Sequence, residues 1–435
     1  MMIRKWMMIF VLLPLLAQAQ DSLQAPKVEQ IQTLFDSLKT HPQTVADQLN
    51  LEKALMGKRM VTGMLFPKVN AFGRYEYANT PSGMLPLAPN DLLKMVQNQT
   101  VPQPFSQNIF RMGIGVSMPV FALSIYSTAA KAKAMYHSAE AKAHINLLQN
   151  EALIVSTNAS LQYLNALLKA LAAKKASLDK TLKVIQLQVK NGRVPKTALL
   201  KIRNALNEVG ILQNNILQQQ QKAYAAIRSL TGVTLTQPVP MVQQGTYQNG
   251  RFAVLDPLKK MTEAQKIAWR AEKEKLVPSI FFNGSYNHSM AKAYNNDKNI
   301  NEDYGTVALT LNIPLFAKSQ YAAIKKSRLD YESSQNELKK KELEIGSEAR
   351  ALENNLPLLD QSVKLYEKSV KDKEELLKIA RVAYLSHRMT VEDYLKYEDA
   401  LVMEESQLYS ARAKKWQTLM QLAVLFGNNI EQIVK

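Results

Sequence analysis

One stretch of this chain occurs twice, and the second copy follows the first without a gap in the alignment. Residues 119–232 recur at 314–427, an offset of 195 residues. At the start of the two copies, residues 119–126 and 314–321 are identical at five of eight positions. At their ends, Leu230 and Gly232 align with Leu425 and Gly427. A sequence that states one structural unit twice is expected to fold as two copies of that unit.

The first 19 residues have the layout of a secretory signal peptide. Arg4 and Lys5 precede an apolar run at 6–16, and Ala17 and Ala19 form a small-residue cleavage site before Gln20. The run of about ten apolar residues is too short to span a bilayer. We therefore expect an exported protein, with a signal peptide at 1–19.

Composition limits the kinds of site and partner that the mature chain can have. It has no cysteine, which excludes disulfides, thiolate metal sites and a lipid-anchored cysteine. The formal net charge is +18, but lysines alternate with acidic residues at 339–344 and 371–375. This mixture is typical of solvated helix faces, so we expect no nucleic-acid partner. No apolar run after the signal peptide approaches the ~18 residues of a membrane helix, so any membrane crossing would use strands.

Two pairs of strands are predicted, one pair in each repeat. They lie at about 68–78 and 108–118, and at about 279–288 and 304–313. At 110–118 and 306–313, apolar residues alternate with small or polar ones. This alternation over about ten residues is typical of outer-membrane barrel strands, and a half-buried strand of a soluble sheet has the same pattern. Long connections at 80–107 and 289–303 join the strands of each pair.

Two long helices are predicted after each strand pair, at about 122–190 and 196–230, and at about 317–385 and 391–425. Between 122 and 190 there is no proline or glycine, and one face follows alternating steps of four and three, as in a coiled coil. The residues on this seam are Leu164, Leu168, Leu171, Lys175, Leu178, Leu182, Ile185 and Val189. The second copy keeps the phase at Leu359, Val363, Tyr366, Val370, Lys373, Leu377, Ala380 and Tyr384. Pro357 should kink its helix.

These elements predict an α+β membrane protein built from a duplicated helix–strand–strand–helix–helix unit, with repeats at 20–245 and 246–435. A continuous helix of this length would reach roughly 100 Å. Four strands cannot close a barrel, for which about eight are needed, and open edges are not tolerated in lipid. Several protomers must therefore pool their strands; three would give twelve, although the spacing does not fix that number.

Several local motifs resemble the TolC-like outer membrane efflux protein family, over nearly all of the mature chain. They are His41-Pro42, the Pro67 and Pro278 that precede strands, the strand exits at 118–121 and 313–316, and the helix tips at 189–200 and 384–395. The resemblance implies a homotrimer with a twelve-stranded β-barrel in the outer membrane of a Gram-negative bacterium and a long periplasmic helical barrel. It also implies an exit duct for a tripartite efflux or type I secretion system, which works with an inner-membrane transporter and a periplasmic adaptor protein.

The two helix tips are the candidate site for adaptor docking and gating. The residues carried over from the resemblance are Gly192, Arg193, Val194, Pro195, Thr197, Leu200, His387, Arg388, Met389, Thr390, Asp393 and Leu395. Turn chemistry explains the same residues: Gly192 suits a left-handed cap and Pro195 a first helical turn. Thr390 can cap the returning helix, with Asp393 completing a capping-box-like arrangement.

The tips depart from the family pattern at three positions. An aspartate that the family often has at both tips is Ala198 at the first and Asp393 at the second, and a further acid one turn on is Lys396. His387 replaces the glycine of the second tip. The charge expected at the aperture is therefore a ring of Asp393 flanked by Lys396.

No pattern in the chain indicates an enzyme. The five histidines are scattered, and no metal-binding His-Glu-x-x-His pattern occurs. We expect no catalytic residue, metal or cofactor, and a passive duct that exports small molecules. The alternatives are a protein-secretion duct and, from another class, a soluble periplasmic coiled-coil scaffold whose strands form a small sheet.

Overall fold

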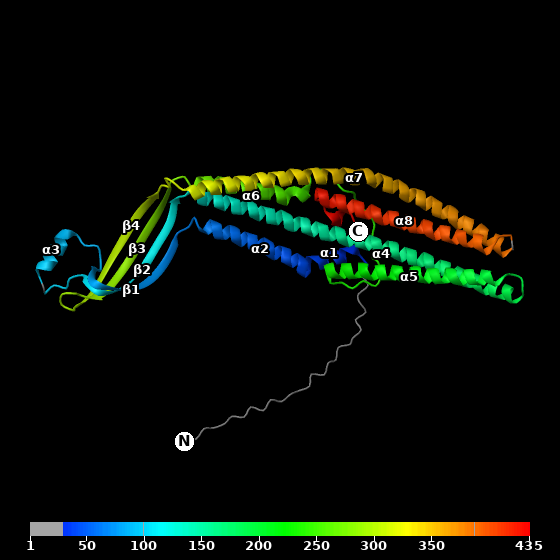
Figure 1. Cartoon of the computed structure of the whole chain (residues 1–435), viewed down its shortest axis with the longest axis horizontal. Helices are drawn as coiled ribbons and strands as arrows, with labels where there is room; N and C mark the ends of the chain where they lie inside the picture. The colour runs from blue at the N-terminus through cyan, green and yellow to red at the C-terminus, as the bar shows by residue number, and fades with distance from the viewer. Residues whose placement is uncertain (1–28, 99, 387) are drawn as a thin grey trace, which may run out of the picture.

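The computed structural model describes residues 29–98, 100–386 and 388–435. The predicted signal peptide at 1–19 and the tip residue His387 lie outside these residues. The described chain is long and narrow, with the strands at one end and two helical hairpins reaching the other (Figure 1). None of its helices combines the length and apolarity that crossing a bilayer requires.

The strands form one antiparallel sheet in the order β1-β2-β3-β4, so the two repeats meet where β2 pairs with β3. The strands are β1 (Lys68–Gly83), β2 (Phe105–Phe121), β3 (Ser279–Lys292) and β4 (Asn299–Asn312). β1 and β4 are the two edges. β1, β2 and β3 run three to five residues past a predicted end, and β4 starts five residues early. The reason is that backbone pairing continues beyond the apolar alternation, for example between Ser82 and Ser106.

The strand register brings the apolar residues of all four strands to one face of the sheet. Val116 of β2 lies opposite Val69 of β1 and Gly284 of β3, and Gly284 lies opposite Val307 of β4. Partners that face each other across strands share a face. Many apolar side chains on this face are exposed to solvent in the single chain; they include Val69, Tyr75, Phe110, Met112, Ile114, Tyr286, Val307, Leu309 and Leu311.

The opposite face of the sheet is polar. Near the loop end, Glu76 of β1 pairs with Arg74 and with Arg111 of β2. Further along, Ser285 of β3 hydrogen-bonds to Thr306 of β4 at 2.8 Å. The sheet is therefore apolar on one side and polar on the other, with neither edge paired.

The connection between β1 and β2 contains a helix that the sequence analysis missed. α3 (Pro89–Gln97) lies beyond the ends of the strands (Figure 1). The connection is anchored by a small core in which Met84 packs with Ile109, Ala293 and Ile300. No residue of α3 itself is buried, so periodicity within nine residues was a weak signal for it.

The long helices repeat with the offset of the sequence. α4 (Leu123–Lys190) and α5 (Lys196–Thr231) form the first hairpin, and α7 (Lys318–Leu385) and α8 (Val391–Phe426) the second; every bound of the second pair lies 195 residues after its counterpart. α7 continues through Pro357, and Figure 1 shows it bending gently along its middle. The remaining helices are α1 (Ile31–Thr40), α2 (Pro42–Gly63), α6 (Asp256–Glu274) and two 3-10 turns, η1 (Ala253–Leu255) and η2 (Ile430–Gln432).

The predicted coiled-coil seam of the first hairpin is confirmed. Leu164, Leu171, Leu178 and Ile185 of α4 are buried in one core with residues of α5 at a spacing of seven, namely Ile202, Val209 and Ile216. In the second hairpin Val370 and Ala380 are buried. The two seam lysines differ, because Lys175 is exposed whereas Lys373 forms an ion pair with Glu404 of α8.

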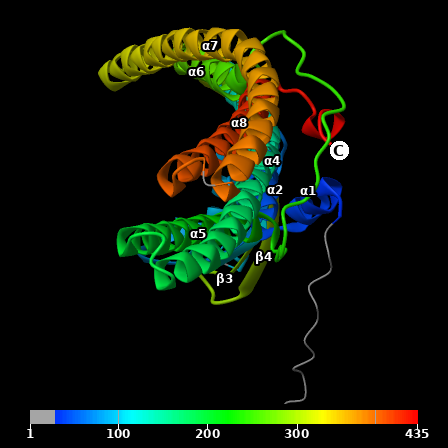
Figure 2. The ribbon, with the colours of Figure 1, turned by 90° about the vertical axis from the view of Figure 1, so that its right-hand side faces the viewer.

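α4 is the central helix of the molecule. It packs against α2, α5, α6 and α8, whereas α7 packs against α6, α8 and η1. Viewed along the long axis, the two hairpins lie on an open arc (Figure 2). The helix tips are therefore held at the end farthest from the sheet.

Candidate functional site: the helix tips

The first tip is a tight turn that Gly192 makes possible. α4 ends at Lys190, and Gly192 takes a left-handed φ of 70°. The amide of Arg193 donates to the carbonyl of Gln188 at 2.9 Å, and that of Gly192 to Val189 at 3.1 Å, which satisfies carbonyls left free at the helix end. The predicted glycine cap is confirmed. Pro195 precedes the first residue of α5 as its N-cap, one position before the predicted first turn.

The described residues of the second tip repeat a backbone bond of the first and add a side-chain cap. The amide of Arg388 donates to the carbonyl of Ala383 at 2.8 Å, the counterpart of the Arg193 bond. The hydroxyl of Thr390 accepts from the amide of Asp393 at 3.1 Å and donates to its carboxylate at 2.8 Å. This confirms the N-cap, although the carboxylate meets the Thr390 hydroxyl and not the backbone amide of a standard capping box.

The charges at the tips are partly paired. Lys396 lies 2.9 Å from the carboxylate of Asp393, one turn away on α8. The hydrogen bonds from Lys396 and Thr390 lower the pKa of Asp393, so this group stays ionised at neutral pH. Within the described residues, the exposed Arg193 and Arg388 form no ion pair. Both arginines are therefore available for contact with another molecule.

The other predicted tip residues divide between packing and exposure. Val194 and Leu395 pack against the seam of the first hairpin. Thr197 and Leu200 are exposed, and Met389 is half-buried. Ala198, which stands where the first tip lacks its aspartate, is only 8% exposed and lies in the seam, so a carboxylate there would be buried.

Sequence reasoning missed the ion pairs that tie the hairpins together. Lys201 of α5 pairs with Glu392 of α8, and Lys174 of α4 pairs with Asp399 of α8. Val391, Leu395 and Val402 of α8 pack on the same seam. The partners are about 190–225 residues apart in sequence, as in the 225 that separate Lys174 from Asp399, so no local pattern could have paired them.

A buried tyrosine also joins the two hairpins near the tips. Tyr394 of α8 is 2% exposed and stacks on Tyr384 of α7, with ring centroids 5.1 Å apart. Its hydroxyl lies 3.0 Å from that of Ser177 on α4 and donates to Glu398 at 2.7 Å. Burial raises the pKa of Tyr394 to about 12, so the phenol remains a donor at any physiological pH.

Several solved structures share this fold. No protein-family model matches the sequence, and no curated protein does. Among solved structures, the outer membrane protein VceC from Vibrio cholerae is similar with a TM-score of 0.76 and 15% identity, covering 92% of this chain and 96% of that one. For the Campylobacter jejuni CmeC outer membrane channel the TM-score is 0.75 and the identity 14%, over 91% of this chain and 85% of that one. For the Neisseria gonorrhoeae MtrE outer membrane channel the TM-score is 0.74 and the identity 13%, over 92% of this chain and 89% of that one.

This chain has the fold of the TolC-like outer membrane channels. The similarity extends over most of both chains. The resemblance found in the helix-tip and strand-exit motifs is thereby confirmed for the fold.

The helix tips present a surface for contacts. Among the described residues, no group of three or more histidines, cysteines or carboxylates could hold a metal ion. What the tips present instead is a rigid turn, two exposed arginines and ion pairs that hold α8 against α4 and α5. In the part of the chain that the structure describes, this arrangement places two unpaired positive charges on the exposed end of the hairpins.

Proposed function

We propose that the protein is a passive exit duct in the outer membrane, through which a tripartite efflux system exports small molecules. Its partners in this proposal are an inner-membrane transporter and a periplasmic adaptor protein. The observation that carries the proposal is the four-stranded sheet, which has one exposed apolar face, one polar face and two unpaired edges.

The sheet supports insertion into lipid as part of a closed assembly. Val307 and Leu309 of β4 are 77% and 70% exposed, which is unfavourable in water and favourable against lipid chains. The unpaired backbone groups of β1 and β4 must find partners in a bilayer, because no water is present there. Pairing β1 of one copy with β4 of the next satisfies both edges, and three copies supply twelve strands around a polar lumen.

The hairpins support a tunnel that ends at the tips. Each 68-residue helix is roughly 100 Å long at 1.5 Å per residue. A second copy beside the open arc of Figure 2 would continue the wall of helices. In this arrangement Arg193, Leu200 and Arg388 face the adaptor at the tunnel entrance, and the Lys201–Glu392 and Lys174–Asp399 pairs hold the entrance closed.

The proposal is tested first by the location of the protein and by its conductance. The protein purified from outer membranes in mild detergent should run as a trimer and give discrete current steps in a planar bilayer. A soluble scaffold would instead be released from membranes by carbonate and would leave the bilayer silent. Protein that washes off membranes and never inserts would refute the duct.

The role of the tips is tested separately, by variants that leave the sheet intact. Gly192→Pro should impair export because proline cannot adopt a φ of 70°. Arg388→Glu should impair it by reversing an exposed charge at the tip. Arg350→Glu on α7, exposed and far from the tips, is the matched control. Normal export by both tip variants, with trimers intact, would remove the case for adaptor docking at these residues.

A further inference from the structure

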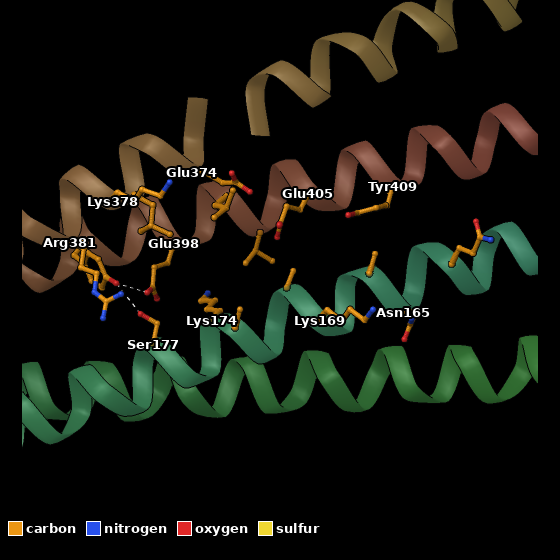
Figure 3. Close-up of a pocket in the computed structure, with 18 of the residues that line it drawn as sticks. Asn165, Lys169, Lys174, Ser177, Glu374, Lys378, Arg381, Glu398, Glu405 and Tyr409 are labelled. Atoms are coloured by element: carbon orange, nitrogen blue, oxygen red, sulfur yellow. Dashed lines mark hydrogen bonds between the residues drawn. The ribbon is translucent and has the colours of Figure 1, made fainter. Parts of the chain in front are cut away.

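A cavity of about 690 Å³ lies in the wall of the molecule between α4 and the α7–α8 hairpin (Figure 3). Its length follows α8 from Tyr394, near the tip, to Tyr409. α4 and α8 touch at both ends of it, where Ser177 meets Tyr394 at 3.0 Å and Tyr163 meets Ser406 at 3.4 Å. The cavity is therefore built within one copy of the chain.

Three of the residues that face the cavity from α4 are alanines, and they leave space opposite α8. Ala166, Ala170 and Ala173 line the α4 side, opposite Leu401 and Val402 of α8. The contacts at the two ends set the distance between α4 and α8, and methyl side chains on the α4 wall cannot fill it. The space left between them has an apolar floor.

One carboxylate that lines the cavity is buried, and only one of its two oxygens has a hydrogen-bond partner in the described part of the chain. Glu398 is 3% exposed, and one of its oxygens accepts the hydrogen bond from Tyr394. The other oxygen, Oε2, is buried and has no hydrogen-bond partner among the described residues. An unpaired buried carboxylate oxygen is costly, so a donor that reaches this oxygen from the cavity by a turn of the Glu398 side chain would gain this bond.

A second carboxylate lies on the same side of α8. Glu405 follows Glu398 by seven residues, two helical turns, which places the two about 10 Å apart along the helix axis. Figure 3 shows both facing α4. Leu401 and Val402, which lie between them in sequence, also line the cavity. Burial, followed by the charge of Glu374, raises the pKa of Glu405. Neither Glu405 nor Glu374 forms an ion pair within the described residues.

The cavity also has basic residues, which are placed differently. Lys169, Lys378 and Arg381 line it but are exposed, so their charged heads remain hydrated at the rim. Lys174 is already paired with Asp399. The rim charges should weaken the binding of a cation at low salt, but within the described residues none of them hydrogen-bonds to the unpaired oxygen of Glu398.

We propose that this cavity binds an elongated organic dication, a linear diamine, whose ammonium groups meet Glu398 and Glu405 while its methylene chain covers Leu401 and Val402. The two carboxylates fix the distance between the charges, and the apolar stretch between them excludes a compact, fully hydrated ion. The ligand would lie between α4 and the α7–α8 hairpin of the same copy. The site does not depend on the proposed duct function, and the two proposals can fail separately.

The test is calorimetric titration of the full-length protein in non-ionic detergent at neutral pH. Octane-diamine, whose extended length matches the spacing of the carboxylates, should bind at least about tenfold more tightly than propane-diamine, which is too short. Octane-diamine should also bind more tightly than octylamine, which carries one charge, by a similar factor. Equal affinity for octane-diamine and octylamine, no binding heat, or preferential binding of octanoate would overturn the proposal.

Variants then locate the binding in this cavity. Glu398→Gln keeps the shape of the side chain and removes its charge, and it should lower the affinity for octane-diamine at least about tenfold. Glu375→Gln, exposed on α7 outside the cavity, should bind as the unaltered protein does. If Glu398→Gln does not fold, the affinity of Glu405→Gln and the chain-length series still show whether the diamine binds in this cavity. Unchanged affinity in the Glu405 variant would refute the site.

Discussion

Three glycines at helix ends provide a controlled test of the packing described above. Gly192 after α4, Gly232 after α5 and Gly427 after α8 have φ angles of 70°, 72° and 72°. Substitution by alanine therefore imposes the same backbone strain at each. The surroundings of the added methyl differ: it meets nothing within 4 Å at Gly192, His41 at 3.9 Å for Gly232, and the Cβ of Ala253 at 2.5 Å for Gly427.

The expected free energies of unfolding follow from these distances. A left-handed conformation costs an L-residue about 1–2 kcal/mol. Gly192→Ala and Gly232→Ala should therefore each lower the free energy of unfolding by that amount. At Gly427 the new methyl must displace Ala253, and overpacking of this kind adds about 1–3 kcal/mol. Gly427→Ala should therefore lose about 2–5 kcal/mol.

Unfolding in detergent, followed by circular dichroism, would rank the three variants. The double variant Gly427→Ala with Ala253→Gly identifies the cause, because it removes the clashing methyl and keeps the strained backbone. When Gly427→Ala is added to the Ala253→Gly variant, the free energy of unfolding should fall by no more than it does for Gly192→Ala in the unaltered protein. A Gly427→Ala variant as stable as Gly192→Ala, or no recovery in the double variant, would refute the reasoning.

Three further predictions concern the hairpins and their core. Leu178→Ala, at a fully buried seam position, should lower the unfolding free energy by about 2–5 kcal/mol, whereas Lys175→Ala, exposed in the same seam, should leave denaturant unfolding nearly unchanged. Thr390→Val removes the cap of α8 and should lower stability by about 1 kcal/mol in the same assay. Burial, with Glu431 nearby, raises the pKa of Glu151 from its ordinary 4.5 to about 7. The native state then holds a proton that the unfolded chain has released, so stability should fall by up to about 3 kcal/mol as pH rises through that window. Glu151→Gln should abolish this fall in melts at pH 5 and 8; a fall that persists would contradict it.

The sequence predicted those parts of the fold that depend on neighbours along the chain. The seam of α4 and α5 follows from heptad spacing, and the turn at Gly192 from the need for a left-handed residue. The cap at Thr390 is equally local, because it joins residues three positions apart. In each case the interacting atoms lie within one or two helical turns, so a one-dimensional pattern contains the information.

What the sequence did not reveal depends on contacts between distant segments. Lys201 and Glu392 come together only because α8 packs across the first hairpin. The buried Tyr394 and Glu398 stand at positions whose burial comes from α4, not from their own hairpin alone. α3 was missed for the opposite reason, since none of its residues is buried and packing left little trace in its sequence.

The two hairpins repeat one sequence unit, yet their surfaces differ in a way that the repeat alone cannot explain. α4 buries seventeen residues and α7 only three, although both have 68 residues and the same seam phase. α4 is covered by α2, α5, α6 and α8, while α7 has fewer neighbours. On α7, Leu358, Leu365 and Ile379 recur at multiples of seven and are 60%, 61% and 66% exposed. This apolar stripe, which Asp372 interrupts, is what a further helix would cover. In the proposed assembly, the open arc of the single chain leaves that position for a second copy.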